Sequence, residues 1–113
     1  MILVYTAGPY TLGDKAVNIH RAREIAMELW LKGYAVICPH TNSAWFDEMC
    51  TVDYNTFLAG CLRMVEVADA LLMLPGWTTS HGAKVERKHA LTLGIPVFAY
   101  PDLPPMNTKS RRK

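Results

Sequence analysis

The sequence predicts a single doubly wound, Rossmann-like α/β domain, with four parallel strands in the order 2-1-3-4 and helices on both faces. Three observations predict it. Strand-like and helix-like segments alternate along the chain, the strand-like segments are continuously apolar, and the turns from helix to strand are short. Continuously apolar strands are typical of parallel sheets, whose faces are covered by right-handed crossover helices. A chain of 113 residues, 50% of them hydrophobic, has enough apolar side chains for one core and no room for a second.

The first half of the chain predicts a strand, a helix and a second strand. Residues 2–7 are apolar up to Gly8-Pro9, so they predict a buried strand. Residues 16–32 predict a helix that Gly33 ends. Its apolar positions recur at helical spacing and are Ala22, Ile25, Ala26, Leu29 and Trp30. Residues 34–38 predict a second buried strand, and a polar loop over residues 39–52 follows it.

The second half of the chain repeats this alternation. Residues 54–65 carry an amphipathic helical pattern, and residues 70–74 form an apolar strand that Asp69 opens. Residues 82–93 predict a third helix, and residues 95–100 a fourth strand. The inward positions of the third helix are expected to be Val85, His89, Ala90 and Leu93.

The last residues differ in composition from the rest of the chain. The α/β domain is expected to span residues 1–100, and residues 101–113 form a basic tail that contains proline. This tail has no apolar pattern that could pack, so we expect it to be mobile or to contact a neighbouring subunit.

The charge distribution argues against a nucleic-acid-binding surface. Four of the twelve Lys and Arg residues lie in the tail, which leaves residues 1–108 with eight cations against ten acids. A polymer such as DNA or RNA requires a basic patch, so we expect no nucleic-acid partner. Because so short a chain buries a modest share of its surface, subunit contacts are favoured and a homo-oligomer is expected.

The amino terminus and the cysteines restrict the location and the cofactors. Residues 1–5 lack a basic segment, and their apolar run is too short for a signal peptide or a membrane span, so we expect a cytoplasmic protein without membrane contact. Three cysteines without a CxxC pair argue against a disulfide framework and a zinc site, and Cys38 and Cys61 are expected to fill the core. Neither GxGxxG nor GxxxxGK[ST] occurs, so no metal or cofactor is expected.

The long loops all lie on one side of the predicted sheet. They follow the strands and cover residues 8–15, 39–52 and 75–81, whereas the turns that precede the strands are minimal. In open parallel sheets, ligands bind beyond the carboxyl ends of the strands, where helix amino termini offer unpaired N–H groups. The sequence therefore predicts a ligand site at this edge.

Residues 74–86 carry the strongest site signal. Ser80 is a good N-cap for the third helix, and Gly82 allows a ligand to approach the backbone. Glu86 shares its helix face with residues that pack on the sheet, so its carboxylate is expected to point inward, which is costly unless the group is hydrogen-bonded or functional. The alternative is a structural acid, capping or paired with a neighbouring cation; these cations are Lys84, Arg87 and Lys88.

Other candidates carry weaker signals. Tyr5 is either strand filler or a phenol that reaches a carboxylate at the strand ends, and His40 and Asn42 stabilise a turn or line the site. The loop aromatics suggest stacking on a flat ligand or oligomer contacts; they are Trp45, Phe46 and Trp77. Charged residues outside the site are expected to be solvated or to cap elements; they are Asp14, Lys15 and Asp69.

Several short motifs together match a known family. They are YTAGPY at residues 5–10, Asn18, GYAVICPHTN at residues 33–42, ADA at residues 68–70, LPGW at residues 74–77 and SHGAKVE at residues 80–86. Over roughly residues 1–100 the chain resembles the DUF4406 proteins, small proteins common in phages and bacteria. These proteins are similar to the nucleoside 2-deoxyribosyltransferase superfamily, and the stretch from LPGW to Glu86 is the most specific part of the match.

The resemblance implies that an N-glycosidic bond is the target. It implies that Glu86 attacks the anomeric carbon of a nucleotide sugar and that Tyr5 orients Glu86. In that superfamily a serine six residues before the nucleophile is typical of enzymes that act on 5′-monophosphates, and Ser80 occupies this position. Phosphate, sugar and base contacts are expected at the remaining matched positions; these are Gly8, Pro9, Tyr10, His40, Asn42, Trp77, Ser80 and Gly82.

One position departs from the family pattern. An aspartate eight residues before the Asp of the third strand is often part of the site, and here this position is Cys61. A thiol cannot replace the charge-assisted hydrogen bond of a carboxylate. The chain is then a slow N-glycosidase or deoxyribosyltransferase, an enzyme oriented by Asp53 or Asp47, or a non-catalytic protein that sequesters a nucleotide or a nucleotide-derived signal. A scaffold without a ligand leaves the uneven loop lengths unexplained.

Overall fold

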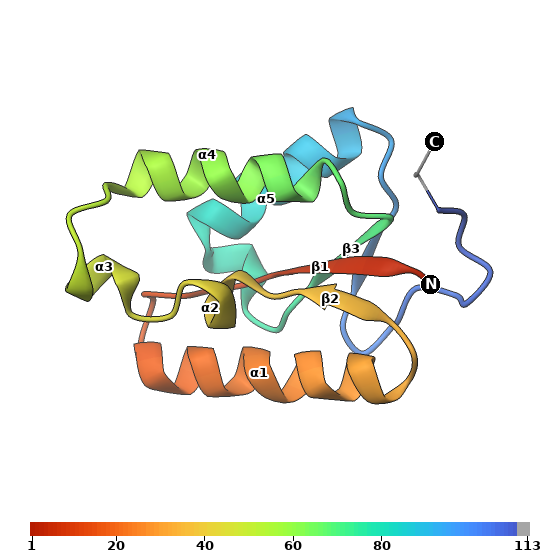
Figure 1. Ribbon diagram of the computed structural model, residues 1–113, viewed down its shortest axis with the longest axis horizontal. Coiled ribbons are helices and arrows are strands. Elements are labelled where there is room, and N and C mark those ends of the chain that lie inside the picture. Colours follow the sequence, from red (N-terminus) through yellow and green to blue (C-terminus); the bar gives the residue numbers. More distant parts are fainter. Residues whose placement is uncertain (111–113) are drawn as a thin grey trace.

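The computed structural model describes residues 1–110 and contains one four-stranded sheet (Figure 1). All pairings are parallel, and the strand order is β2-β1-β3-β4. The strands are β1 (Leu3–Ala7), β2 (Ala35–Ile37), β3 (Ala70–Met73) and β4 (Val97–Ala99). The predicted strand order and parallel direction are confirmed.

The two central strands carry the apolar core of the sheet. In β1, Val4 pairs with Val36 of β2 on one side and with Ala70 of β3 on the other. Every residue of β3 is buried, whereas the edge strands β2 and β4 have no fully buried residue. Residues 34–38 were expected to form a buried strand; Tyr34 and Cys38 are buried, but the three residues of β2 between them are half-buried, because an edge strand has a neighbouring strand on one side alone.

Helix α1 (Lys15–Leu31) covers one face of the sheet (Figure 1). Asp14 caps its first turn by accepting a hydrogen bond from the backbone N–H of Val17, and Leu29 is fully buried against the sheet. Trp30, which was expected to point inward, is 54% exposed, because the adjacent Leu29 occupies the inward position. No helix within residues 1–110 is long and apolar enough to cross a membrane.

Helices α4 (Tyr54–Val65) and α5 (His81–Thr92) cover the opposite face. Val65 and Ala90 are buried there against the central strands, so the prediction of helices on both faces is confirmed. Leu93 was expected to be inward, but it follows the last helical residue and is 40% exposed.

The segment between β2 and α4 is more ordered than a polar loop. It contains two one-turn helices, α2 (Pro39–Asn42) and α3 (Phe46–Met49). Pro39 begins α2, where its missing N–H costs nothing. A third short element, the 3₁₀ helix η1 (Trp77–Thr79), connects β3 to α5.

The segment after β4 packs back onto the α1 face of the sheet. Leu103 contacts the core, Pro104 is buried, and the Tyr34 hydroxyl donates a hydrogen bond to the Pro104 carbonyl oxygen. The expectation of a tail without packing was therefore wrong for residues 103–104. The three basic residues at positions 111–113 lie outside the described residues.

The start of β3 is fixed by Asp69. Its carboxylate accepts a hydrogen bond of 2.8 Å from the backbone N–H of Leu3, at the edge of the sheet where the strands begin. This contact agrees with the predicted structural role of Asp69. Asp69 therefore lies at the edge where the strands begin, and a ligand site is expected at the opposite edge, where the strands end.

Candidate active site

Tyr5 and Glu86 meet between the central strand β1 and helix α5. Tyr5 is a fully buried residue of β1, and Glu86 is a residue of α5 that is 7% exposed. The Tyr5 hydroxyl donates a hydrogen bond to Oε2 of Glu86. Among residues 1–110, Glu86 forms no ion pair with the cations beside it on its helix, so the alternative of a salt-bridged acid is not what the geometry shows.

A cavity of about 570 Å³ opens beside this pair. Its walls come from the segments that follow β1, β2 and β3 and from α4. The lining residues are Thr6, Gly8, Tyr10, Thr11, Leu12, Pro39, His40, Ser43, Asp47, Val52, Tyr54, Phe57, Leu58, Cys61, Thr79, Ser80, His81, Gly82, Ala83 and Glu86. A cavity of this size holds a small organic molecule.

Burial controls the protonation of the pair. Burial raises the pKa of Glu86 to about 7, against the opposing effects of the Tyr5 hydrogen bond and of the charge on His40. Burial and the neighbouring Glu86 carboxylate also raise the pKa of Tyr5, so the phenol keeps its proton. Near neutral pH, Glu86 therefore exists both as a carboxylate and as an acid, and Tyr5 orients it in either form.

The amino terminus of α5 forms another wall of the cavity. The Ser80 hydroxyl accepts a hydrogen bond of 3.2 Å from the backbone N–H of Ala83, which confirms Ser80 as the N-cap. A Cβ atom added to Gly82 would lie 3.3 Å from the Tyr54 hydroxyl, so a side chain there would crowd this wall. The first turn of a 12-residue helix at a cavity favours negatively charged groups of a ligand.

His40 is a buried residue of α2 that forms a hydrogen bond with the loop after β1. Its Nε2 atom lies 2.7 Å from the Pro9 carbonyl oxygen, so Nε2 carries a proton and donates it. Its Nδ1 atom is buried without a hydrogen-bond partner in the described part of the chain. Burial alone would lower the pKa of His40, but contacts with the Cys38 thiol and the Pro9 carbonyl, and the charge of Glu86, raise it.

Cys61 packs against the core, as expected, and it also lines the cavity. It lies on α4 beside Tyr5, is partly exposed, and is close enough to Glu86 for the two groups to interact electrostatically. Burial raises the pKa of its thiol, which is therefore protonated at neutral pH. Of the other acids considered for this role, Asp53 caps α4 by accepting a hydrogen bond from Thr56, and Asp47 lines the cavity.

A cluster of charged and aromatic residues joins α3 to the start of α1 at the cavity. The Lys15 ammonium lies 2.5 Å from Asp47 and 2.7 Å from Glu48, so the expectation that Lys15 is solvated was wrong. The Tyr10 hydroxyl donates to Asp47 over 3.1 Å and accepts a hydrogen bond of 2.7 Å from the backbone N–H of Trp45. Lys15 holds the pKa of the Asp47 carboxyl below its usual range, so Asp47 is ionised.

The structure brings together most of the residues expected from the sequence. The cavity wall includes Gly8, Tyr10, His40, Ser80, Gly82 and Glu86. Gly8 has a packing role as well, because an added Cβ would lie 2.7 Å from the Cβ of Leu74.

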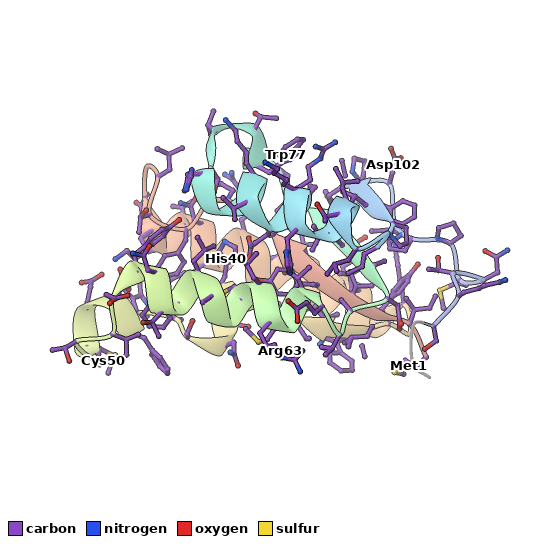
Figure 2. All side chains as sticks on the ribbon, turned by 90° about the horizontal axis from the view of Figure 1, so that it is seen from above. Met1, His40, Cys50, Arg63, Trp77 and Asp102 are labelled. Carbon is purple, nitrogen blue, oxygen red and sulfur yellow. The ribbon has the colours of Figure 1, made fainter. Side chains whose placement is uncertain are left out.

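Three expected contact residues lie elsewhere. Pro9 contributes its carbonyl group to His40, and Asn42 is exposed at the end of α2. Trp77 packs against the core between the sheet and α5, with the Arg87 guanidinium 5.2 Å from its ring centroid. In Figure 2, Trp77 lies on the side of α5 away from α4, whereas His40 lies on the side toward α4.

The wall formed by α4 was missed in the sequence. Tyr54, Phe57 and Leu58 line the cavity, although their spacing predicts ordinary core positions. Helical periodicity identifies the apolar face of a helix, but it does not show whether this face meets a sheet or a cavity. No group of three or more His, Cys, Asp and Glu within residues 1–110 is arranged to hold a metal ion.

Comparison with known structures shows a related fold. A 2-deoxyribosyltransferase from the psychrotolerant bacterium Bacillus psychrosaccharolyticus matches 86% of this chain and 70% of its own, with a TM-score of 0.61 and 19% identity. A 2-deoxyribosyltransferase from Leishmania mexicana matches 94% of this chain and 69% of its own, with a TM-score of 0.62 and 18% identity. At this identity the likeness concerns the fold.

Comparison of the sequence with family models identifies its family. No curated protein is similar enough in sequence to match. The model of DUF4406, a domain of unknown function, matches residues 2–99, which is almost the whole described chain. The chain is therefore a member of the DUF4406 family.

Proposed function

We propose that this protein cleaves the N-glycosidic bond of a nucleoside or deoxynucleoside 5′-monophosphate, either by hydrolysis or by transfer of the sugar to a second base. The observation that carries the proposal is the hydrogen bond from buried Tyr5 to Glu86 at the base of the cavity. A carboxylate that is oriented by a phenol and faces a cavity fits a nucleophile better than a structural acid.

The chemistry divides into two displacements. In the first, a carboxylate oxygen of Glu86 bonds to the anomeric carbon, and the carbon–nitrogen bond breaks with its electron pair going to the base. In the second, water or another base attacks the same carbon and releases the Glu86 carboxylate. Tyr5 keeps the Glu86 carboxyl group in place through both steps by its hydrogen bond to Oε2, because its own proton stays on the phenol.

A 5′-phosphate is proposed to lie at the amino terminus of α5. Ser80 and Gly82 lie there on the cavity wall, together with His81. Free N–H groups and the helix dipole at this end favour an anion. The likeness in fold to 2-deoxyribosyltransferases supports a nucleoside-derived ligand, and the Ser80 position favours the monophosphate.

A homo-oligomer is also proposed. Trp45, Phe46 and Met49 form an exposed apolar group on and beside α3, with Met49 77% exposed. Apolar side chains gathered on one short element are typical of subunit contacts.

A second candidate function is favoured by Cys61. A thiol stands in the cavity where related proteins often carry an aspartate, so a protein that sequesters a nucleotide without cleaving it fits the same cavity. Incubation with the common ribo- and deoxyribonucleoside monophosphates, followed by chromatography for free base, separates the two functions. Released base that disappears in Glu86→Gln supports the enzyme, and tight binding without released base supports the sequestering protein.

A further inference from the structure

Three of the side chains that line the cavity, His40, Asp47 and Cys61, are poorly suited to protonate a leaving base. A neutral base departs as an anion unless an acid protonates it during bond cleavage. His40 lines the cavity, but its Nε2 proton is donated to the Pro9 carbonyl oxygen, and its Nδ1 atom is buried. Asp47 is ionised beside Lys15, and the Cys61 thiol is a weakened acid because its pKa is raised.

The charges of the cavity favour a positive group. Among the described residues, its lining contains the carboxylates of Asp47 and Glu86 but no Lys or Arg side chain. Lys15, which lies just behind Asp47, is shared with a second carboxylate, that of Glu48. The carboxylates of Asp47 and Glu48 therefore outnumber the one ammonium group, and Glu86 adds a third acid, whereas the basic side chains of the lining are two histidines, His40 and His81.

The α4 wall adds aromatic side chains to this environment. Tyr54 and Phe57 both line the cavity. Aromatic rings attract cations through their negative faces, and this attraction grows when water is excluded. A flat cationic ring therefore fits both the apolar and the electrostatic character of the wall.

We propose that the preferred substrates are nucleotides whose base is positively charged before the bond breaks, such as N-alkylated purine or pyridinium nucleotides; this inference rests on the proposed function. Glu86 bonds to the anomeric carbon, and the electron pair of the breaking carbon–nitrogen bond neutralises the cationic ring. The base leaves as a neutral molecule, so no acid is needed. Water then attacks the anomeric carbon, and its proton passes to solvent as the Glu86 carboxylate is released.

A cationic base also activates the nucleophile. Its charge favours the ionised form of a nearby carboxylate and so lowers the pKa of Glu86 from about 7. By linkage, ionised Glu86 binds the cation more tightly than protonated Glu86 does. A neutral base lacks this coupling.

The activity test compares guanosine 5′-monophosphate with 7-methylguanosine 5′-monophosphate, each as ribo- and deoxyribonucleotide, at a pH where the methylated base is cationic. We expect kcat/KM to be higher for the methylated nucleotide by about 100-fold or more, the range that a general acid normally supplies. Glu86→Gln abolishes both reactions. Equal release of the two bases would overturn this inference and leave the proposed function intact.

A binding test is independent of turnover. Titration calorimetry compares 1-methylnicotinamide, a cation, with neutral nicotinamide. We expect tighter binding of the cation to the wild type and loss of this preference in Glu86→Gln. Absence of the preference would overturn the inference. If no nucleotide releases base, the proposed function itself fails, and the inference fails with it.

His81 provides the remaining check, because it lines the cavity and is exposed at the start of α5. If His81→Gln lowered the release of guanine much more than that of 7-methylguanine, His81 would be a general acid and the inference would be wrong. We expect His81→Gln to change both rates by the same factor. The matched control is His20→Gln, on the exposed surface of α1.

Discussion

The Tyr5 hydroxyl and the Glu86 carboxylate, 81 residues apart in the chain, are joined by a buried hydrogen bond between the central strand β1 and helix α5. Burying a carboxylate is costly unless a hydrogen bond compensates for the lost water. The hydrogen bond from Tyr5 engages Oε2 of Glu86 and leaves Oε1 available to a ligand. The hydrogen bond also opposes the rise in the pKa of Glu86 that burial causes. Both catalysis and stability are therefore expected to depend on this pair.

Glu86→Gln separates a nucleophile from a structural acid. The amide keeps the shape of the side chain but cannot attack, so turnover should fall by about 10³-fold or more while nucleotide affinity changes little. Single-turnover kinetics and a melting curve on the same preparation measure both effects. The control is Glu24→Gln on the exposed face of α1. A chemical rate that is unchanged in Glu86→Gln, with a loss of about 1–3 kcal/mol in stability, would identify Glu86 as structural.

The raised pKa of Glu86 predicts how stability depends on pH. Glu86 has a pKa of about 7 in the folded protein and about 4.5 when unfolded, so the folded state binds more protons between these values. Its contribution to stability is complete below pH 4.5 and is lost as the pH rises through 7, by on the order of 3 kcal/mol. Urea titrations of the wild type and Glu86→Gln from pH 4 to 8 should show this difference in slope. Parallel curves for the two proteins would contradict the raised pKa.

The arrangement of the sheet was predictable because it depends on local patterns. Buried parallel strands require apolar runs, and the glycines and prolines that end them are visible in the sequence. The inward direction of Glu86 followed from the same helical periodicity that places Ala90 in the core. The spacing of apolar residues is therefore enough to predict which face of a helix points toward the core.

The rest of the site depends on contacts between distant segments. Lys15 and Asp47 are 32 residues apart, and either residue alone is typical of a solvated surface. Cys61 has the spacing of a core position, but it also faces a cavity that α4 shares with the segments after β1, β2 and β3. Contacts between segments that are distant in the sequence cannot be predicted from local periodicity.

The exposed apolar group of Trp45, Phe46 and Met49 predicts self-association. Light scattering at micromolar concentration should give a mass above the 12.7 kDa of one chain. Met49→Glu should shift the protein toward the monomer, because a charge within a subunit contact is poorly solvated. Met106→Glu, at a comparably exposed position after β4, is the control. A wild-type protein that is monomeric at this concentration would refute the oligomer.

The Lys15 cluster predicts a salt-sensitive wall of the cavity. No residue of α3 is buried, so its position depends on the contacts of Lys15 and Tyr10 with Asp47 and on the neighbouring Glu48. Lys15→Met should speed amide exchange over residues 45–49, and added salt should do the same to the wild type. Lys88→Met, on α5, is the matched control. Unchanged exchange in Lys15→Met would show that other contacts hold α3.

Cys61→Asp should supply the acid that the family resemblance implies at this position. The new carboxylate lies beside Tyr5 and Glu86, and two neighbouring carboxylates share a proton, which raises the pKa of one of them. The protonated partner can then donate to a leaving base, so release of neutral bases should rise by about 10-fold or more. The repulsion should also lower stability above neutral pH, where both groups ionise.

Cys61→Asn tests whether charge or shape is responsible. The amide has nearly the size of aspartate but no proton to give, so it should leave the rate on neutral bases unchanged. Release of free guanine from guanosine 5′-monophosphate is measured for the wild type and both variants between pH 5 and 8. For Cys61→Asp the rate should fall as the pH rises past the point where the shared proton is lost, whereas Cys61→Asn should keep the wild-type profile. If Asn and Asp raised the rate equally, a polar group without an acidic proton would be sufficient, and the missing acid would not explain slow turnover.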